Sequence, residues 1–429
     1  MPEIYTVKIV NTGEIFSPSE QKGPLWEKAL EASRGITHAV CLCRQGDDPR
    51  TVAIKLSPNK KYYLARYGAT HHHRKDCRFY GLNPTQSGRQ GYTQQAVLEQ
   101  ADGSLAIKLA RSLSPPRGAV EANLKAVQQS RSAQGVRRSA MGLGGLLDLL
   151  WEEADLNQWN SGTSKRWDLK TGTLLLRQAE RIHVGSHTLD KALLLPAFKE
   201  TPEATRNLKI VEKARKSGLR LIVIAPLAKF DESRDSWADT NVETAQPLQM
   251  LLGTSYGTPK MMLTAASRTA VQSSYHNEIA AWKRDEKLYA IAQFVLRDKK
   301  TKYPNEADVA DVLEVCLLHL SERFIPLDSS YEEAIEKLLT EAKRSFIKPL
   351  RYEADDEVFP DFWLLDMGCD YPMEVFGMDT EDYQTRKDQK FKIYSDIKKY
   401  PSGWWYWDAL TKGKIPELPS PPVVEPKEP

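Results

Sequence analysis

The sequence predicts a multidomain α+β protein, and three features of the chain support this. With 429 residues it exceeds a single domain and can bury about two to four hydrophobic cores. Segments with strand-like alternation and segments with helical periodicity fall in separate blocks rather than in one repeat. The last folded block has the order helix, strands, helix, strand. We therefore expect five segments, namely 1–104, 105–140, 141–325, 326–412 and 413–429.

The composition excludes several classes of protein. The 60 Lys and Arg residues and the 57 Asp and Glu residues leave a net charge of +3, so any surface for a polyanion must be local. Five cysteines are too few for a disulfide scaffold in a chain of this length. The first ten residues lack the pattern of a secretory signal, and the apolar run 219–227 is too short to span a bilayer. We expect a cytoplasmic protein without membrane contact.

The segment 1–104 is predicted to be a small β-rich module that holds structural zinc. Cys41 and Cys43 form a C-x-C pair at the end of a strand candidate, and Cys77 follows a run of three histidines. Three cysteines and one histidine suit tetrahedral zinc in a closed site. His73 is the preferred histidine because a three-residue gap separates it from Cys77. The alternatives for the fourth ligand are His71 and His72.

In the competing interpretation, the module 1–104 binds no metal. Its cysteines would then be ordinary buried thiols beside an exposed histidine run, since cysteine is among the most buried residue types. Zinc is favoured because small β modules often need a staple to be stable.

The segment 105–140 is a basic linker with some helical character. Its cations recur with a single acidic residue, Glu121, among them. Such a segment could contact phosphates independently of sequence, or it could be a solvated linker. No aromatic residues are interleaved for base stacking. The cations are Arg111, Arg117, Lys125, Arg131, Arg137 and Arg138.

The segment 141–325 is predicted to combine helices with an α/β unit. The apolar runs 189–198 and 218–230 are expected to be buried strands on either side of a helix that ends at Gly218. Residues 309–320 are predicted to form an amphipathic helix with Cys316 in its core. The segment contains no P-loop, nucleophile elbow or dinucleotide fingerprint.

The segment 326–412 begins with a helix over 328–346. Ser330 is the expected N-cap, and Glu333 is expected to cap it reciprocally. Glu332 flanks the apolar face of this helix, whereas Glu333 points away from it. Of the two acidic residues, Glu332 is therefore the one directed toward the body of the domain.

A predicted hairpin places two carboxylates opposite each other. With its turn centred on Met367 and Gly368, residues whose numbers sum to 735 face each other across the strands, so Asp361 meets Glu374. Two like charges at that distance repel unless a cation lies between them. The pair therefore predicts a magnesium site.

The helix after the hairpin supplies a lysine. Tyr383, Lys387, Lys390 and Tyr394 fall on one stripe at helical spacing, and this stripe should meet the sheet. A carboxylate pair that holds magnesium, with a lysine beside it, is what metal-assisted phosphodiester hydrolysis requires. Residues 413–429, rich in proline, are expected to be an extended, disordered tail that could dock a protein partner.

Pro360-Asp361 followed by Glu374 resembles the PD-(D/E)XK nuclease superfamily, and the predicted element order fits its restriction-endonuclease-like fold. The resemblance implies a magnesium-dependent endonuclease acting on DNA. One position departs from the pattern, because Phe376 stands where the family has its lysine. Some members carry that lysine on the following helix, where Lys390 is the best match. The further candidates are Lys387 for the lysine and Glu332 for the acidic residue of the opening helix.

Residues 38 to 410 resemble an uncharacterised bacterial family, domain of unknown function 1173, through CLC with HHHRKDC, LLDLLWEEADLNQW and FPDFWLLD with MEVFGMDTEDYQ. This resemblance implies a setting on plasmids and other mobile genetic elements but no particular activity. Two functions remain open. One is a DNA nuclease with Asp361, Glu374, Lys390 and Glu332 at its site. The other is a non-catalytic nucleic-acid-binding or assembly protein that keeps the nuclease fold, which Phe376 favours.

Overall fold

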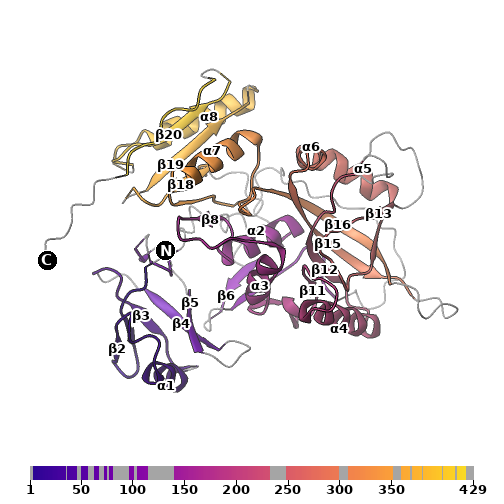
Figure 1. The fold of residues 1–429 in the computed structure, drawn as a ribbon, viewed down its shortest axis with the longest axis horizontal. Helices are drawn as coiled ribbons and strands as arrows, with labels where there is room; N and C mark the ends of the chain where they lie inside the picture. The colour runs from indigo at the N-terminus through magenta and orange to yellow at the C-terminus, as the bar shows by residue number, and fades with distance from the viewer. Residues whose placement is uncertain are drawn as a thin grey trace.

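The computed structural model describes most of the chain, and its helices and strands form four sheets with helices around them (Figure 1). The described residues are 3–34, 36–45, 50–56, 62–66, 72–74, 77–80, 96–100, 104–114, 140–231, 248–298, 308–350, 359–367, 370–378, 380–398, 400–410 and 413–421.

The N-terminal unit is an antiparallel sheet with one helix. Its strand order is β2-β1-β3-β4-β5. The helix α1 (Pro24–Ser33) places Trp26 and Leu30 in the core of this unit, as its amphipathic spacing requires. The strands are β1 (Val7–Ile9), β2 (Ile15–Phe16), β3 (Ala39–Cys41), β4 (Thr51–Leu56) and β5 (Tyr62–Arg66).

A second, four-stranded sheet joins residues from both sides of the expected boundary at 104. Its order is β10-β9-β7-β6, and β7 runs parallel to β9. The strand that precedes residue 104 therefore pairs with β7, and through β7 it belongs to a sheet with the central part of the chain rather than to the N-terminal sheet. The strands are β6 (Val97–Glu99), β7 (Leu105–Ile107), β9 (Ile182–Val184) and β10 (His187–Thr188).

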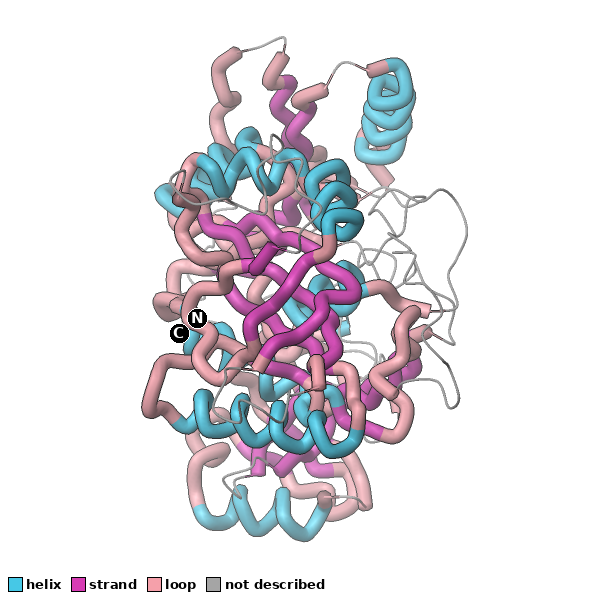
Figure 2. The backbone as a smooth tube through the Cα atoms, turned by 90° about the vertical axis from the view of Figure 1, so that its right-hand side faces the viewer, coloured by secondary structure: helices cyan, strands magenta, loops and turns pink. Residues whose placement is uncertain are grey.

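The central unit is built on a six-stranded mixed sheet of order β11-β12-β15-β16-β14-β13. Figure 2 shows its strands crossing the middle of the molecule, with helices above and below them. The strands are β11 (Leu193–Leu194), β12 (Leu221–Pro226), β13 (Leu248–Met250), β14 (Lys260–Leu263), β15 (Lys287–Leu296) and β16 (Val309–Leu320).

Helices and a short 3₁₀ segment surround this sheet. As predicted, α4 lies between two buried strands and ends at Gly218, whose φ of 67° is the left-handed conformation that glycine adopts most easily. The helices are α2 (Leu143–Glu153), α3 (Asp168–Ala179), α4 (Pro202–Ser217), α5 (Ala265–Ser274) and α6 (His276–Lys283), and the 3₁₀ segment is Leu189–Lys191.

The predicted helix over 309–320 is wrong, because these residues form the long strand β16. β16 pairs with β15 along one edge and with β14 along the other. Most of its side chains are also buried, on both faces of the sheet. A strand covered on both faces loses the polar alternation that reveals an exposed sheet, and an apolar run then resembles a buried helix. Cys316 is buried in this strand.

The C-terminal unit has the predicted order of helix, strands, helix and strand. Its sheet has the order β20-β19-β18-β17-β8, with all neighbours antiparallel except β19 and β20. The fifth strand, β8, comes from the chain between α2 and α3. The elements are β8 (Gln158–Trp159), α7 (Ser330–Glu341), β17 (Phe346–Ile347), β18 (Phe362–Leu364), β19 (Tyr371–Phe376), α8 (Glu381–Tyr394) and β20 (Trp405–Asp408).

The two helices of this unit cover opposite faces of its sheet. Met373 and Val375 share a core with Ile335 and Leu339 of α7. Successive side chains of a strand point to opposite faces, so Glu374 and Phe376 face α8. This alternation directs Glu374 toward the helix that carries Lys390.

The expected disordered tail is ordered in its first part. Ile415 and Leu418 pack on the core beneath α7, and Trp405 Nε1 donates a hydrogen bond of 3.0 Å to the carbonyl of Glu417. Arg344, which forms a bidentate ion pair with Asp366, also contacts the Pro419 carbonyl. The end of the tail, 422–429, lies outside the described residues, as do Gly368, His71 and most of the basic linker.

Candidate functional site

Four buried side chains in the N-terminal unit form a candidate metal centre. The ligand atoms of Cys41, Cys43, His73 and Cys77 all lie within 4.8 Å of one another. His73 Nδ1 lies 3.6 Å from the sulfurs of both Cys43 and Cys77. Among the described residues this is the one group of three or more His, Cys, Asp and Glu ligands gathered so closely. The cluster could bind a metal such as zinc, and His72 is not part of it.

The electrostatics of the cluster suit a cation. A hydrogen bond from Cys41 and a smaller effect of one from Cys77 lower the pKa of the Cys43 thiol. The Arg74 backbone N–H also donates a hydrogen bond of 3.3 Å to the Cys43 sulfur. Hydrogen bonding to Cys43 and burial raise the pKa of Cys41. Three sulfurs in one buried place share negative charge that a divalent metal would neutralise.

The hairpin of the C-terminal unit has the predicted register. Phe362 pairs with Met373 and Leu364 with Tyr371, so paired residue numbers sum to 735. Asp361 lies one residue before β18, next to Glu374 in this register. Its Oδ2 accepts a hydrogen bond of 2.7 Å from the Val375 backbone N–H, which fixes the orientation of the carboxylate.

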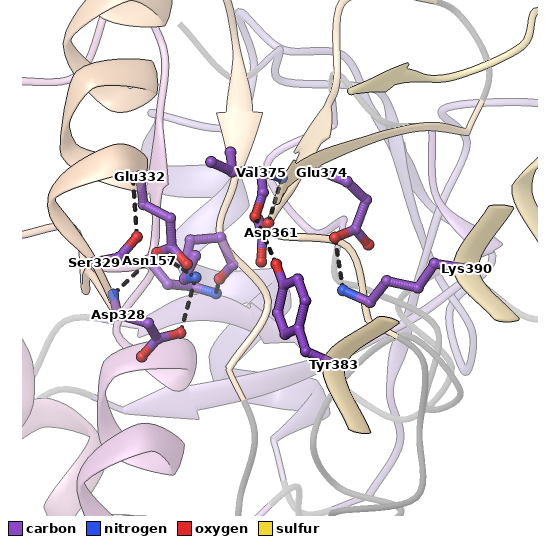
Figure 3. A network of polar contacts seen from close by, with 10 residues as sticks. Asn157, Asp328, Ser329, Glu332, Asp361, Glu374, Val375, Tyr383 and Lys390 are labelled. Atoms are coloured by element: carbon purple, nitrogen blue, oxygen red, sulfur yellow. Dashed lines mark hydrogen bonds and ion pairs between the residues drawn. The ribbon is translucent and has the colours of Figure 1, made fainter. Parts of the chain in front are cut away.

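The two candidate lysines of α8 meet different carboxylates. Lys390 Nζ lies 2.6 Å from Glu374 Oε2, and the Glu374 side chain is buried. Lys387 Nζ instead lies 2.7 Å from Asp408 Oδ2, beyond the edge of β19. Figure 3 shows Lys390 reaching Glu374 while Asp361 lies between this ion pair and α7.

An aromatic side chain occupies the strand position two residues after Glu374. Phe376 is 2% exposed and stacks on Phe391 of α8 at 5.6 Å between ring centroids. This position therefore belongs to the contact between sheet and helix and contributes no charge.

The first turn of α7 is capped one residue earlier than predicted. The Ser329 hydroxyl, rather than that of Ser330, accepts the hydrogen bond from the Glu332 N–H, and Glu332 Oε2 accepts one from the Asp328 N–H. Glu332, not Glu333, is thus the reciprocal cap. This geometry turns the Glu332 carboxylate inward, where it is buried.

Lys348, which the sequence reading missed, completes the charge cluster. It follows β17, is 3% exposed, and places Nζ 2.6 Å from Glu332 Oε2 and 3.0 Å from Asp328 Oδ2. Burial by itself lowers the pKa of this ammonium, but the charges of Asp328, Glu332 and Asp361 outweigh burial and raise it. Burial also raises the pKa of Glu332, to about 7. The carboxylates of Asp328 and Asp361 add to this rise, whereas the Lys348 ammonium opposes it.

The lysines and carboxylates of the C-terminal unit described above, apart from Asp408, line one cavity of about 810 Å³. Its walls come from the C-terminal unit and from α6 and the end of β16 in the central unit. The carboxylates in its lining are Asp148 and Glu278 of the central unit and Asp328, Glu332, Asp361 and Glu374, and the lysines are Lys348, Lys387 and Lys390.

The fold and the cysteine–histidine cluster define a mixed α/β protein with a candidate metal centre in its N-terminal unit. The chain belongs to the family described as Protein of unknown function (DUF1173), whose model matches residues 18–409. None of the curated proteins matches the sequence. Within the described residues, no helix has both the length and the apolar character needed to cross a membrane.

Proposed function

We propose that this protein is a metal-dependent nuclease of the PD-(D/E)XK type that hydrolyses phosphodiester bonds in DNA. The observation that supports it best is the position of Lys390, whose ammonium lies 2.6 Å from Glu374 beside Asp361 in the wall of a large cavity. The order of α7, three antiparallel strands, α8 and a parallel strand agrees with that fold. The mobile-element setting, implied by the family resemblance, belongs to the same proposal.

Each residue of the site has a distinct role in this proposal. Asp361 and Glu374 would hold magnesium, since hard oxygen ligands at neighbouring positions suit that ion. Bound magnesium would polarise the phosphodiester and lower the pKa of a water. Lys390 balances the charge of Glu374 and would stabilise the anion that develops at phosphorus. Glu332 is auxiliary, and Tyr383 anchors the end of β19 by donating a hydrogen bond of 3.3 Å to the Val375 carbonyl.

The second candidate function is a non-catalytic nucleic-acid-binding protein with the same fold. The specific observation in its favour is Phe376, which fills the usual lysine position with a buried ring. Lys390 would then be a structural partner of Glu374 alone.

We propose that the N-terminal cluster holds one structural zinc ion. A closed set of four protein ligands leaves no open position for a substrate, so its role would be stability rather than catalysis. The thiols of this cluster fit a reducing, cytoplasmic compartment.

A nicking assay tests the nuclease directly. Plasmid and linear DNA are incubated with magnesium or manganese and with wild-type protein, Asp361→Asn, Lys390→Ala or the matched control Lys387→Ala. Lys390→Ala should reduce cleavage about a hundredfold or more, because a preorganised charge at the reacting group is lost. Lys387→Ala should have a much smaller effect, since its ammonium binds Asp408.

Two outcomes would contradict the assignment. Absence of cleavage by the wild-type protein with every metal and substrate would favour the binding protein. Cleavage that survives both Asp361→Asn and Lys390→Ala would move the active site elsewhere in the chain.

A further inference from the structure

The cavity beside Asp361 lies between the C-terminal unit and the central unit. One wall is the strand-end region of the C-terminal unit with α7 and α8. The other is α6, together with Arg284 and His319 of the central unit. Any substrate that reaches Asp361 and Glu374 must therefore fit between these two walls.

Cations lie on both walls. Arg284 lines the central wall, where it is ion-paired with Glu286 at 2.6 Å, and Arg386 lines the opposite wall. The carboxylates lie deeper, since Glu374 and Glu332 are buried whereas Arg386 is exposed. A chain of phosphates entering this space would meet Arg284 on one side and Arg386 on the other before it reaches the buried carboxylates.

Aromatic side chains add a second feature to the lining. Tyr331 and Tyr383 line the cavity and are half-buried, so each keeps part of its surface toward the space. Tyr331 packs edge-on against Trp407 at 5.6 Å, which fixes its orientation. Basic side chains that reach the phosphates, together with rigid aromatic rings on which bases stack, are the combination by which proteins bind single strands.

The size of the cavity argues against an intact double helix. The volume of about 810 Å³ is too small to enclose a segment of B-DNA, whose major groove alone is ~12 Å wide. The volume lies instead in the range of about 300–1,000 Å³ that holds one compact ligand. Unstacked nucleotides of a single strand meet this limit.

We propose that the site takes single-stranded nucleic acid, as a free strand, a tail or a flap, and rejects continuous duplex. This inference rests on the proposed nuclease site, whose substrate class it names. DNA and RNA single strands share the phosphates and base faces that the two walls recognise.

The test compares substrates of one sequence in four forms, as single-stranded DNA, single-stranded RNA, blunt duplex DNA and duplex DNA with a single-stranded tail. Binding is measured by fluorescence anisotropy without divalent metal, and cleavage is measured with magnesium or manganese. We expect single strands and tailed duplexes to bind at least about tenfold more tightly than blunt duplex, and cleavage to fall within or next to the single-stranded part. The comparison of single-stranded DNA with single-stranded RNA shows whether the site prefers deoxyribose or ribose in its substrate.

Two variants connect the preference to the central wall. Arg284→Ala removes a cation that lines the cavity, whereas the matched control Lys283→Ala removes its neighbour, which lies over the Phe230 ring and does not line the cavity. Arg284→Ala should weaken single-strand binding several-fold, and Lys283→Ala should leave it unchanged. Thermal melting of both variants shows that each remains folded.

The outcomes separate this inference from the nuclease proposal. Equal binding and cleavage of blunt duplex and single strands would overturn the inference and leave the nuclease standing. A preference for single strands that depends on Arg284, without cleavage of any substrate, would support the inference and overturn the nuclease. An equal loss of binding in Arg284→Ala and Lys283→Ala would remove the central wall from the binding site and overturn the inference.

Discussion

Lys348 is the residue on which the charge balance of the cavity depends. Its ammonium is buried between α7 and β17 and contacts Glu332 and Asp328 at ion-pair distances. Removing one partner of a buried ion pair leaves the other charge without compensation, which costs more than the pair contributes.

Lys348→Met should therefore lower the free energy of unfolding by about 3 kcal/mol, measured by urea denaturation at pH 7. Methionine has a similar length, so the loss reflects charge rather than volume. Lys337→Met is the matched control, because Lys337 lies on the exposed face of α7. It should change the free energy of unfolding by less than about 0.5 kcal/mol. Equal stability of both variants would show that Glu332 is neutral and needs no partner.

The sequence predicted which residues lie opposite each other where the number of residues between them determines the pairing, as it does in a hairpin. The sum of 735 follows from the two-fold symmetry of a hairpin, and the structure has that register. Lys348 could not be found in this way, because its partners lie on a helix whose approach to β17 depends on tertiary packing. A lysine directly after a short apolar run was the only available signal.

At the scale of elements, the exit of β19 passes closely beneath α7. A Cβ atom added at Gly377 would lie 2.5 Å from Cδ2 of Tyr331, which real structures do not tolerate. The ring of Tyr331 is itself held against Trp407. Glycine is therefore required at this position by close approach rather than by backbone angle.

Gly377→Ala should destabilise the protein by about 1–3 kcal/mol through overpacking, measured by thermal or urea unfolding. The double variant Gly377→Ala/Tyr331→Ala should lose less than the sum of the two single variants, because the clash disappears with the ring. Strict additivity in this double-mutant cycle would show that Tyr331 moves aside at no cost.

The elements themselves were predictable to different degrees. The helix that ends at Gly218 and α7 have strong end signals or a clear apolar face, and both are present. α8 is polar on most of its surface and was predicted from the spacing of Tyr383, Lys387, Lys390 and Tyr394. The cap of α7 is displaced by one residue because Ser329 and Ser330 are both acceptable N-caps. The strand containing Cys316 was mistaken for a helix because burial on both faces removes its alternation.

At the scale of the whole molecule, the candidate metal centre lies in a unit separate from the cavity. Purified protein should contain about one zinc per chain by elemental analysis, given four ligands in one cluster. Cys41→Ser should lose the metal and destabilise the N-terminal sheet, which Cys41 joins at the end of β3, while cleavage by the C-terminal unit persists.

Cys316→Ser is the matched control for this experiment, because Cys316 is also buried but lies in the central sheet. It should keep the full zinc content even if its stability falls. Fully stable wild-type protein without any zinc would rule out the structural metal.

The strand β8 gives the C-terminal unit a particular folding problem. Asn157 beside β8 and Lys348 beside β17 exchange hydrogen bonds although 191 residues separate them in the chain. During synthesis β8 has no strand partner until β17 has left the ribosome, and closing so long a loop makes this pairing a late event. A fragment cut between α3 and α7 would leave both strands with open edges, and such edges recruit other chains into aggregates. We therefore expect the unit that carries Asp361 and Lys390 to fold only as part of a chain that also contains β8.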